Sequence, residues 1–546
     1  MAPGIAASDL GFAWPDGSTV FDGLSFAFGP GRTGLIGANG CGKSTLLRLI
    51  TGELSPAQGS VQVTGSLGYL PQDLTLRESL RVDEALGIAE ARRALHAIEQ
   101  GDAAARHFAA VGDDWDVEDR AHAILGRLGL GHIDLERRVG NVSGGEAVLL
   151  SLAARFLRRP DVLLLDEPTN NLDLAARRRL YGAVAGWRGV LVLVSHDREL
   201  LDMVDQVADL RDGTIQVYGG NLTGYTEAVA AEQEAAQRMV RAAESDLRRQ
   251  QRELIEARTK LDRRRRYGQK MADEGGLPKI VAGARKRKAQ VSAGKHRTMH
   301  EEKVGEARQR LSEAEDRVWD DDEIRVDLPA TAVPAGRTVL TASGARLRCG
   351  PVVSLDVRGP ERVALLGANG AGKTTFLQAI TGEVPPVAGT VRAAVPLRYL
   401  PQRLDLLDDS GSAVANVARF APGAGPNAIR ARLARFLFRG DRADQVVGTL
   451  SGGERFRVAL AALLLAEPPP QLLLLDEPTN NLDLASIRQL TEALAAYRGA
   501  LIVASHDLPF LRAAGVTRWL CLADGELTET DAPDGAAPPP PHDPGS

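Results

Sequence analysis

Two nine-residue stretches contain the residue types and spacing that most clearly predict chemistry. Gly37–Thr45 reads GANGCGKST and Gly367–Thr375 reads GANGAGKTT, and both fit G-x-x-x-x-G-K-[ST]. In such a loop the backbone N–H groups cradle phosphates, the lysine reaches the outer phosphates and the following hydroxyl holds Mg²⁺. Each stretch therefore predicts one nucleotide site. The residues expected to contact the nucleotide here are Gly37, Asn39, Gly40, Gly42, Lys43, Ser44, Thr45, Gly367, Asn369, Gly370, Gly372, Lys373, Thr374 and Thr375.

Further polar motifs recur in the same order after each loop. Matching residues lie 330 positions apart at Lys43 and at Gln72, 308 apart at Ser143, and 310 apart at Asp166 and His196. One unit therefore occurs twice in the chain. The fall from 330 to 308 places about 22 extra residues in the first copy, and we place them within residues 81–119.

The elements that must position these motifs are short apolar strands. Each phosphate loop follows one, and further buried runs end in Asp-Glu and in Ser-His-Asp. These runs are Thr33–Ile36, Val162–Leu165 and Val190–Val194 in the first copy, and Arg362–Leu366, Leu472–Leu475 and Leu501–Ala504 in the second. Strands that alternate with helical patterns predict an α/β fold with a parallel sheet, whose ligand lies at the carboxyl ends of the strands.

A different composition separates the two copies. Residues 226–266 contain neither proline nor glycine, and apolar residues recur at helical spacing in two stretches. The seam residues are Val240, Ala243, Leu247, Leu254, Ala257 and Leu261, then Val304, Ala307, Leu311, Ala314 and Val318. The pattern predicts two long helices of some 45 residues, spanning roughly 65 Å and paired as a hairpin. The helix breakers Gly275–Pro278 mark its tip.

Charge is concentrated at this tip. The chain has 66 Lys and Arg against 71 Asp and Glu, a net charge of −5, but residues 260–297 have 13 against 3, a local charge of +10. Such asymmetry favours a surface for a polyanion, whereas a plain spacer coiled coil is the alternative. The residues expected to bind this polyanion are Arg263, Arg264, Arg265, Arg266, Lys270, Lys279, Arg285, Lys286, Arg287 and Lys288. Apolar Met271, Leu277, Ile280 and Val281 lie between them, either for contact with the partner or for packing within the hairpin.

These patterns divide the chain into four parts. We predict nucleotide-binding domains over residues 1–221 (cassette 1) and 326–530 (cassette 2), a charged helical linker over 222–325 and a disordered Pro-rich tail over 531–546. No apolar run approaches the ~18–20 residues of a membrane helix, and the N-terminus lacks a signal-peptide pattern. The three cysteines lie far apart, which favours a reduced, cytoplasmic setting.

The full set of motifs resembles the ATP-binding cassette ATPases, so that the fold is expected to be two P-loop cassettes in tandem joined by a long α-helical hairpin. The resemblance implies a Mg²⁺ site at Ser44, Thr374, Gln72, Gln402, Asp166 and Asp476. It implies catalytic roles for Glu167, Glu477, His196, His506, Gln72 and Gln402, with the glutamates polarising the attacking water. With both glutamates present, two hydrolytic sites are expected.

The same resemblance implies that each site is shared. The signature of one cassette closes over the nucleotide held by the other, so Lys43 would face Ser451 and Lys373 would face Ser143. The residues involved are Ser143, Gly144, Gly145, Ser451, Gly452 and Gly453, with D-loop residues Asp173 and Asp483. Glu146 and Glu454 stand where transporters usually have glutamine.

An aromatic residue for adenine is expected in one copy alone. Trp14 can stack on adenine in cassette 1, whereas residues 339–353 contain no aromatic residue. Arg346 or Arg348 could stack instead. Nucleotide at Lys373 is therefore expected to bind more weakly or less selectively.

The arrangement of two whole cassettes around a charged helical linker resembles the ABC-F family of translation proteins. The resemblance implies binding in the ribosomal tRNA exit site, contact with ribosomal RNA and P-site tRNA, and a monomeric chain whose two cassettes pair. It implies either a general translation role or displacement of ribosome-targeting antibiotics. The alternatives are an ATPase subunit of a drug exporter with separate membrane subunits and a non-hydrolysing regulator. The extra residues of cassette 1 could form a short arm against the ribosome or a plain helical elaboration.

Overall fold

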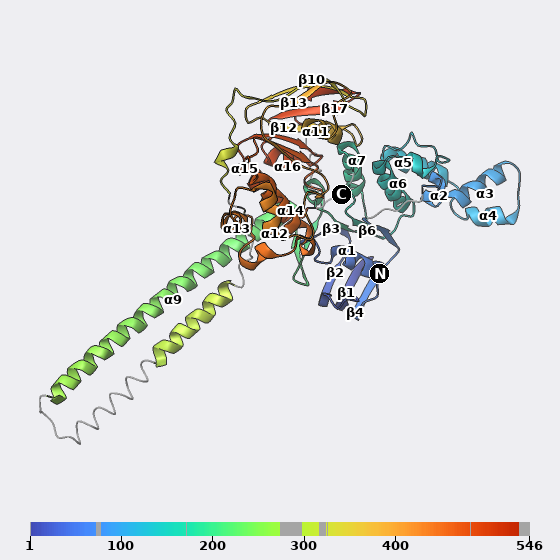
Figure 1. Ribbon diagram of the computed structural model, residues 1–546. Helices are drawn as coiled ribbons and strands as arrows, with labels where there is room; N and C mark the ends of the chain where they lie inside the picture. Colours follow the sequence, from blue (N-terminus) through green and yellow to red (C-terminus); the bar gives the residue numbers. More distant parts are fainter. Residues whose placement is uncertain are drawn as a thin grey trace. The chain divides into compact units, whose positions relative to one another are not determined.

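A computed structural model describes residues 2–72, 78–170, 172–273, 298–315, 324, 326–480 and 482–533. The chain divides into two compact units (Figure 1). One comprises Met1–Leu222 with Asp322–Ser546 and therefore contains both cassettes, and the other is Thr223–Asp321. The tail from residue 534, the breakers Gly275–Pro278 and the apolar tip residues Leu277, Ile280 and Val281 lie outside the described residues.

Cassette 1 is built on a mainly parallel sheet. Within the described residues it has six strands in the order β5-β6-β7-β3-β8-β9, of which β9 is antiparallel. Continuous runs of Val, Leu and Ile form its central strands, and the residues of β6 and β7 are buried throughout. The strands are β3 (Gly31–Ile36), β5 (Leu67–Leu70), β6 (Val162–Asp166), β7 (Val190–Val194), β8 (Gln206–Arg211) and β9 (Thr214–Gly219).

A separate antiparallel sheet, in the order β2-β1-β4, packs on helix α1 of cassette 1. Its strands alternate buried and exposed residues, so one face joins the core. Leu10, Phe21 and Phe28 pack there with Leu46 and Leu47 of the helix. The elements are β1 (Gly4–Ala13), β2 (Thr19–Phe28), β4 (Gln58–Thr64) and α1 (Lys43–Thr51).

Cassette 1 has four described helices between Gln72 and the signature helix, whereas cassette 2 has two in the same interval. The additional residues are therefore helical, and α3 and α4 lie within the predicted range 81–119. The helices are α2 (Val82–Leu86), α3 (Ala89–Glu99), α4 (Ala105–Val111), α5 (Val117–Arg127), α6 (Gly144–Leu157), α7 (Leu174–Ala185) and α8 (Arg198–Leu201), with the 3₁₀ turn η1 (Val139–Asn141).

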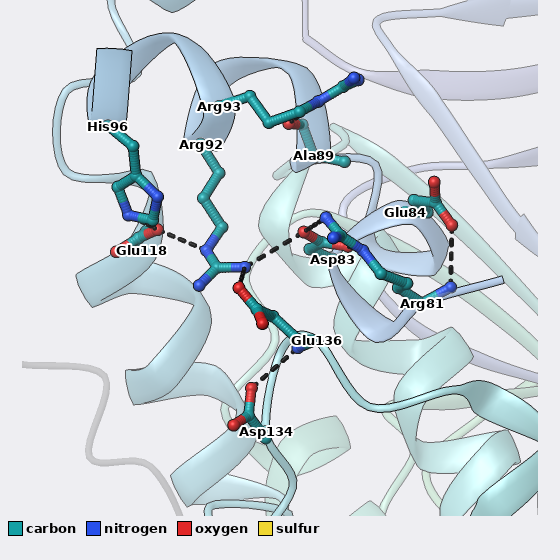
Figure 2. Close-up of polar contacts among 10 residues, drawn as sticks. All are labelled: Arg81, Asp83, Glu84, Ala89, Arg92, Arg93, His96, Glu118, Asp134 and Glu136. Atoms are coloured by element: carbon teal, nitrogen blue, oxygen red, sulfur yellow. Dashed lines mark hydrogen bonds and ion pairs between the residues drawn. The ribbon is translucent and has the colours of Figure 1, made fainter. Parts of the chain in front are cut away.

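An ion cluster holds three of these helices together (Figure 2). Arg92 of α3 contacts Glu118 of α5 at 2.6 Å, the fully buried Asp83 of α2 at 3.2 Å and Glu136 at 3.5 Å. Arg81 provides a second cation for Asp83. A carboxylate without solvent needs such partners, because an unpaired buried charge is costly. Arg92 therefore fixes α3 against α2 and α5.

Cassette 2 repeats the plan with one difference. Its antiparallel strands continue the parallel sheet, so the described residues form one sheet in the order β13-β10-β11-β18-β17-β12-β16-β15-β14. The join is the pairing of Val352 with Glu526. The strands are β10 (Thr338–Arg346), β11 (Val352–Arg358), β12 (Arg362–Leu366), β13 (Ala388–Ala393), β14 (Leu397–Leu400), β15 (Leu472–Asp476), β16 (Ala500–Ala504), β17 (Arg518–Ala523) and β18 (Glu526–Thr530).

The helices of cassette 2 pack on this sheet, and Phe456 of α14 and Phe510 of α16 are among the buried side chains of the core. These helices are α11 (Lys373–Thr381), α12 (Ala413–Phe420), α13 (Pro426–Ala434), α14 (Gly452–Leu464), α15 (Leu484–Ala496) and α16 (Leu508–Ala513), with the 3₁₀ turns η2 (Pro329–Thr331), η3 (Gly440–Asp444) and η4 (Val447–Thr449).

The second unit contains the long helix between the cassettes. Helix α9 (Leu222–Asp273) has 52 residues, so it is about 78 Å long at 1.5 Å per residue, longer than the predicted 65 Å. A second helical segment covers residues 298–315. Arg258 pairs with Glu301 at 2.9 Å and Arg310 with Asp246 at 3.2 Å, which joins the two segments as a hairpin. The seam residues Val304 and Ala307 are buried as expected.

Candidate functional site

The first phosphate loop lies at the carboxyl end of β3 and leads directly into α1. Lys43 folds back over the loop, and its Nζ donates to the carbonyl oxygens of Gly37 at 2.9 Å and Ala38 at 3.0 Å. Gly37 and Gly42 have φ values of +149° and +103°, and a Cβ on Gly37 would lie 2.4 Å from the Leu210 oxygen. Both backbone shape and space therefore require glycine at Gly37.

The second phosphate loop repeats this geometry at the end of β12. The Nζ of Lys373 donates to the carbonyl oxygen of Gly367 at 2.7 Å and lies 2.9 Å from Nε2 of His506. Burial lowers the pKa of Lys373, and the neighbouring Glu477 and Asp476 oppose that shift. Two similar cradles therefore stand at equivalent sheet edges.

The strand-end residues gather around each lysine, as the parallel topology requires. Cavities of about 450 and 320 Å³ lie over the two loops, within the size range of small-molecule sites. The first is lined by Trp14, Asn39, Gly40, Gly42, Lys43, Ser44, Thr45, Gln72, Asp166, Glu167, Asn170, Val194 and His196. The second is lined by Leu172, Arg177, Ala368, Asn369, Gly370, Gly372, Lys373, Thr374, Thr375, Gln402, Asp476, Glu477, Asn480 and His506.

A buried glutamate and histidine face each other in both cavities. The Oε1 of Glu167 lies 3.2 Å from Nε2 of His196, and the Glu477–His506 distance is 3.4 Å. Burial raises the pKa of Glu167 to about 8 and that of Glu477 to about 7, and it lowers the pKa of both histidines to about 3. Both histidines are therefore neutral near pH 7, so neither contact is an ion pair.

Both glutamates have a backbone conformation that residues other than glycine rarely adopt. Glu167 has φ +47° and Glu477 has φ +44°, in the left-handed region. Hydrogen bonds hold them there, because the N–H of Glu167 donates to the Val194 oxygen at 2.9 Å and that of Glu477 to the Ala504 oxygen at 2.7 Å. The neighbouring strand therefore aims each glutamate, a strain characteristic of functional sites.

The donor set beside each lysine fits Mg²⁺. Among the described side chains, Oδ1 of Asp476 is buried without a hydrogen-bond partner, while Oδ2 accepts from the hydroxyl of Tyr399 at 3.2 Å. Thr374 and Gln402 line the same cavity, and Ser44, Gln72 and Asp166 do so in cassette 1. Mg²⁺ prefers such oxygen ligands together with water and substrate phosphates. When bound, it would offset phosphate charge.

The two cavities differ at the position for which the sequence predicts adenine stacking. Trp14 lines the first cavity, is 37% exposed and packs edge-on against Phe12 at 5.1 Å. In cassette 2 the residue at the equivalent turn is Leu347. Trp14 directly follows β1 and its carbonyl oxygen accepts from the Gly17 N–H, and Leu347 likewise follows β10 and accepts from the Gly350 N–H. Leu347 is buried, and Arg346 and Arg348 are exposed without lining the cavity.

The signature residues form helix N-termini. Ser143 caps α6 and Ser451 caps α14, and in each case a glutamate three positions on completes a capping box. The Oε2 of Glu454 accepts from the Ser451 N–H at 3.0 Å, and that of Glu146 from the Ser143 N–H at 2.7 Å. The cap needs an acceptor at that position, and the glutamate carboxylate supplies it. Gly144, Gly145, Gly452 and Gly453 form the first helical turns.

The structure brings the D-loops, rather than the signatures, to the opposite phosphate loops. Oδ2 of Asp483 accepts from the Asn39 N–H at 3.0 Å, and Asp173 is close enough to Lys373 to affect its pKa. Neither Ser143 nor Ser451 lines either cavity. That the signature of one cassette faces the loop lysine of the other therefore stays a prediction.

Part of the predicted RNA-binding set can be placed. Arg263, Arg266 and Lys270 are exposed on α9. Arg264 and Arg265 belong to the same helix. Lys279, Arg285, Arg287 and the adjacent lysines 286 and 288 lie outside the described residues, and Met271 lies near the end of α9.

Sequence reasoning missed several residues of these cavities. Asn170 and Asn480 belong to the repeated PTNNLDL string, so the repeat itself was a usable signal. Tyr399, which donates to Asp476, belongs to the string Tyr-Leu-Pro-Gln that ends at Gln402 and, in the first copy, at Gln72. Arg177 lies outside every motif and lines the cavity of the other cassette.

Comparisons with known proteins agree with this geometry. The family described as ABC transporter matches residues 21–170 and 352–480. The tylosin resistance ATP-binding protein TlrC of Streptomyces fradiae is 35% identical over 538 residues, covering 90% of this chain and 92% of the relative. The chain belongs to the ABC-F family of ATP-binding cassette proteins.

Other relatives support the assignment. The probable ATP-binding protein YheS of Escherichia coli K12 is 32% identical, covering 90% of this chain and 75% of YheS. A solved complex of archaeal ribosomal stalk protein aP1 and ribosome recycling factor aABCE1 has a TM-score of 0.55 at 19% identity, covering 94% of this chain and 87% of that one. At that identity it shows the fold alone.

This ABC-F protein therefore binds ATP and is an ATP hydrolase with two cassettes in tandem. None of the helices in the described ranges offers the long uncharged apolar stretch that a bilayer span requires.

Proposed function

We propose that this ABC-F ATPase is a cytoplasmic protein that binds the ribosome at the tRNA exit site and modulates translation or displaces ribosome-targeting antibiotics. The observation that supports it best is the similarity to TlrC, a relative named for tylosin resistance, over 90% of this chain. Ribosomal RNA and the P-site tRNA are the proposed partners, and the chain acts as a monomer whose cassettes pair.

The linker supports an RNA partner. Helix α9 extends about 78 Å, and Arg263, Arg266 and Lys270 are exposed towards its C-terminal end. Structured RNA is recognised largely through its backbone and shape, and clustered cations supply the salt-dependent part of such binding. A long helix with a basic end therefore suits contact with a folded polyanion.

ATP would drive the change that regulates binding. We assign the Mg²⁺-nucleotide sites to the two cavities, with Asp166, Asp476, Ser44 and Thr374 holding the ion. Glu167 and Glu477 would polarise the attacking water, since both are buried beside the loop lysines. Nucleotide between the cassettes would favour the closed, ribosome-bound form, and hydrolysis would release it.

The test is ribosome sedimentation with the double variant E167Q/E477Q. With ATP it should cosediment with ribosomes, because the closed form cannot hydrolyse its nucleotide. The matched control K43A/K373A, which loses the phosphate-binding amines, should stay in the supernatant. Absence of cosedimentation by E167Q/E477Q with ATP contradicts the proposal, and recovery of the protein in a membrane complex would favour an exporter subunit. An antibiotic susceptibility panel then separates resistance from a general translation role.

A further inference from the structure

Arg177 is a buried arginine that the family motifs do not include. It belongs to α7, directly after the D-loop of cassette 1, and is 8% exposed. Its Nη1 pairs with Asp197 at 3.2 Å and its Nε donates to the Leu172 oxygen at 3.3 Å. The Tyr181 hydroxyl donates to the same Asp197 oxygen at 2.6 Å. The guanidinium is therefore held in one place.

That place is the nucleotide cavity of the other cassette. Arg177 lines the same cavity as Lys373, Glu477 and His506, all of cassette 2, whereas its own cassette's cavity does not include it. A buried, permanently charged guanidinium with five N–H donors suits phosphate oxygens. Its position thus adds a second cation to a site that already contains Lys373.

The two sites are unequal in this respect. At the repeat offset of 310 positions, Arg177 of cassette 1 corresponds to the buried Ile487 of cassette 2. Tyr181 corresponds in the same way to Thr491. Asp197 has its counterpart in Asp507, so the acid is kept while the arginine is not. The cavity at Lys43 therefore receives no matching guanidinium from this position.

We propose that Arg177 acts in trans on the second ATP site, as a fixed positive charge that cassette 1 supplies to the outer phosphate of nucleotide bound at Lys373. In hydrolysis the water oxygen bonds to the γ-phosphorus while the bond to the β,γ-bridging oxygen breaks, giving ADP and phosphate. Arg177 forms no covalent bond and transfers no proton. It offsets the negative charge on the phosphate oxygens, which is the main requirement of phosphoryl transfer. The inference concerns ATP hydrolysis and does not depend on ribosome binding.

A purely structural role is the competing explanation. Burial raises the pKa of Asp507, Asp197 raises it further, and Arg177 opposes both effects, so the arginine also balances two acids from different cassettes. Loss of that balance would weaken the cassette contact without favouring one site. The experiment must therefore separate the two sites.

Single-turnover hydrolysis of stoichiometric ATP in site-restricted backgrounds does this. E167Q leaves the second site intact, and E477Q leaves the first. In E167Q, Arg177→Met should lower the hydrolysis rate by about tenfold or more, with a smaller change in nucleotide affinity, and Arg177→Lys should recover part of the rate. In E477Q, Arg177→Met should change the rate less than about twofold. Ile487→Met is the control in both backgrounds.

Thermal denaturation of each variant accompanies the rates. A selective loss in E167Q, partly recovered by lysine, supports the proposal even if the methionine variant is less stable. Equal losses in both backgrounds, a loss confined to E477Q, or no loss in either overturns it. If E167Q itself hydrolyses no ATP, the second site has no independent chemistry and the proposal is also overturned.

Discussion

At the residue scale, burial of the two glutamates makes stability depend on pH. Their folded pKa values of about 8 and about 7 lie above the ordinary 4.5, so the folded state holds protons that the unfolded state has lost. The resulting stability is present below about pH 4.5 and is lost as pH rises through 7 to 8. The nucleotide-free protein thus contains acids that disfavour the fold once charged.

We therefore expect E167Q/E477Q to be more stable than the wild type without nucleotide, by an amount that grows from pH 5 to pH 8.5. The gain should reach the order of a few kcal/mol, because glutamine cannot acquire a charge. Thermal melts across this range measure it, with the exposed Glu526→Gln as control. A double variant less stable than the wild type at pH 8.5 would contradict the expectation.

Trp14 provides the second residue-scale prediction. Trp14→Ala should weaken nucleotide binding at the first site by roughly 1–3 kcal/mol, the range for base stacking on an aromatic ring. Titration of an ATP analogue in a Lys373→Ala background isolates that site. Trp115→Ala is a matched control, because Trp115 is 52% exposed and lies outside the cavity. Equal nucleotide affinities for Trp14→Ala and Trp115→Ala would contradict adenine stacking on Trp14.

The residues within motifs could be predicted, because parallel strands end at one edge of a sheet and each motif marks such an end. The sequence shows Lys43, Asp166 and His196 far apart, and the sheet order brings them together. Arg177 could not be predicted, since its role depends on which cavity its helix faces. The left-handed backbone conformation of Glu167 could not be predicted either, because nothing in a glutamate side chain requires it.

At the element scale, the helices inserted in cassette 1 depend on one ion cluster. Arg92→Met should destabilise the protein by on the order of 3 kcal/mol, because it leaves the fully buried Asp83 with Arg81 as its cation. The double variant D83N/R92M should recover most of this loss. Denaturant unfolding measures both.

The control for that experiment is Arg106→Met, which removes a surface pair with Asp102 and should change stability by less than about 1 kcal/mol. If D83N/R92M is no more stable than R92M, Arg92 stabilises the helices through contacts other than its charge.

Element existence was predictable where apolar periodicity was strong. The strands before the phosphate loops were placed to within two residues, as with Thr33–Ile36 against β3 (Gly31–Ile36). The count of 22 extra residues located α3 and α4 but said nothing of Arg92, because an ion cluster depends on how three helices pack. The sequence showed Glu454 as a departure from transporters, and the structure shows that it completes a capping box with Ser451.

At the scale of the whole molecule, the separation of charge makes the linker responsible for salt-dependent binding. Replacing Arg263, Arg266 and Lys270 with glutamine should weaken ribosome binding. It should also reduce the slope of log K against log salt by about 0.7 for each phosphate that is no longer neutralised. Cosedimentation at increasing salt measures the slope.

A matched variant removes the same charge from cassette 2 by changing Arg346, Arg348 and Arg392 to glutamine, and its slope should stay near that of the wild type. Equal slopes for the two triple variants would show that net charge, rather than the linker, determines salt dependence.

The tandem organisation and the hairpin were predictable from repetition and periodicity. The length of α9 was underestimated, because the helix begins at Leu222 and continues to Asp273.

The pairing of Val352 with Glu526 has a consequence for local opening of the fold. In cassette 2 it links the antiparallel strands to the parallel sheet by main-chain hydrogen bonds, whereas in the described part of cassette 1 the β2-β1-β4 sheet is separate. Local opening of β1 and β2 therefore disrupts side-chain packing but leaves the backbone hydrogen bonds of β9 intact. Opening of β11 instead also breaks its backbone pairing with β18. Amide hydrogens of β1 and β2 should exchange with solvent independently of their central sheet, and those of β11 should exchange together with theirs.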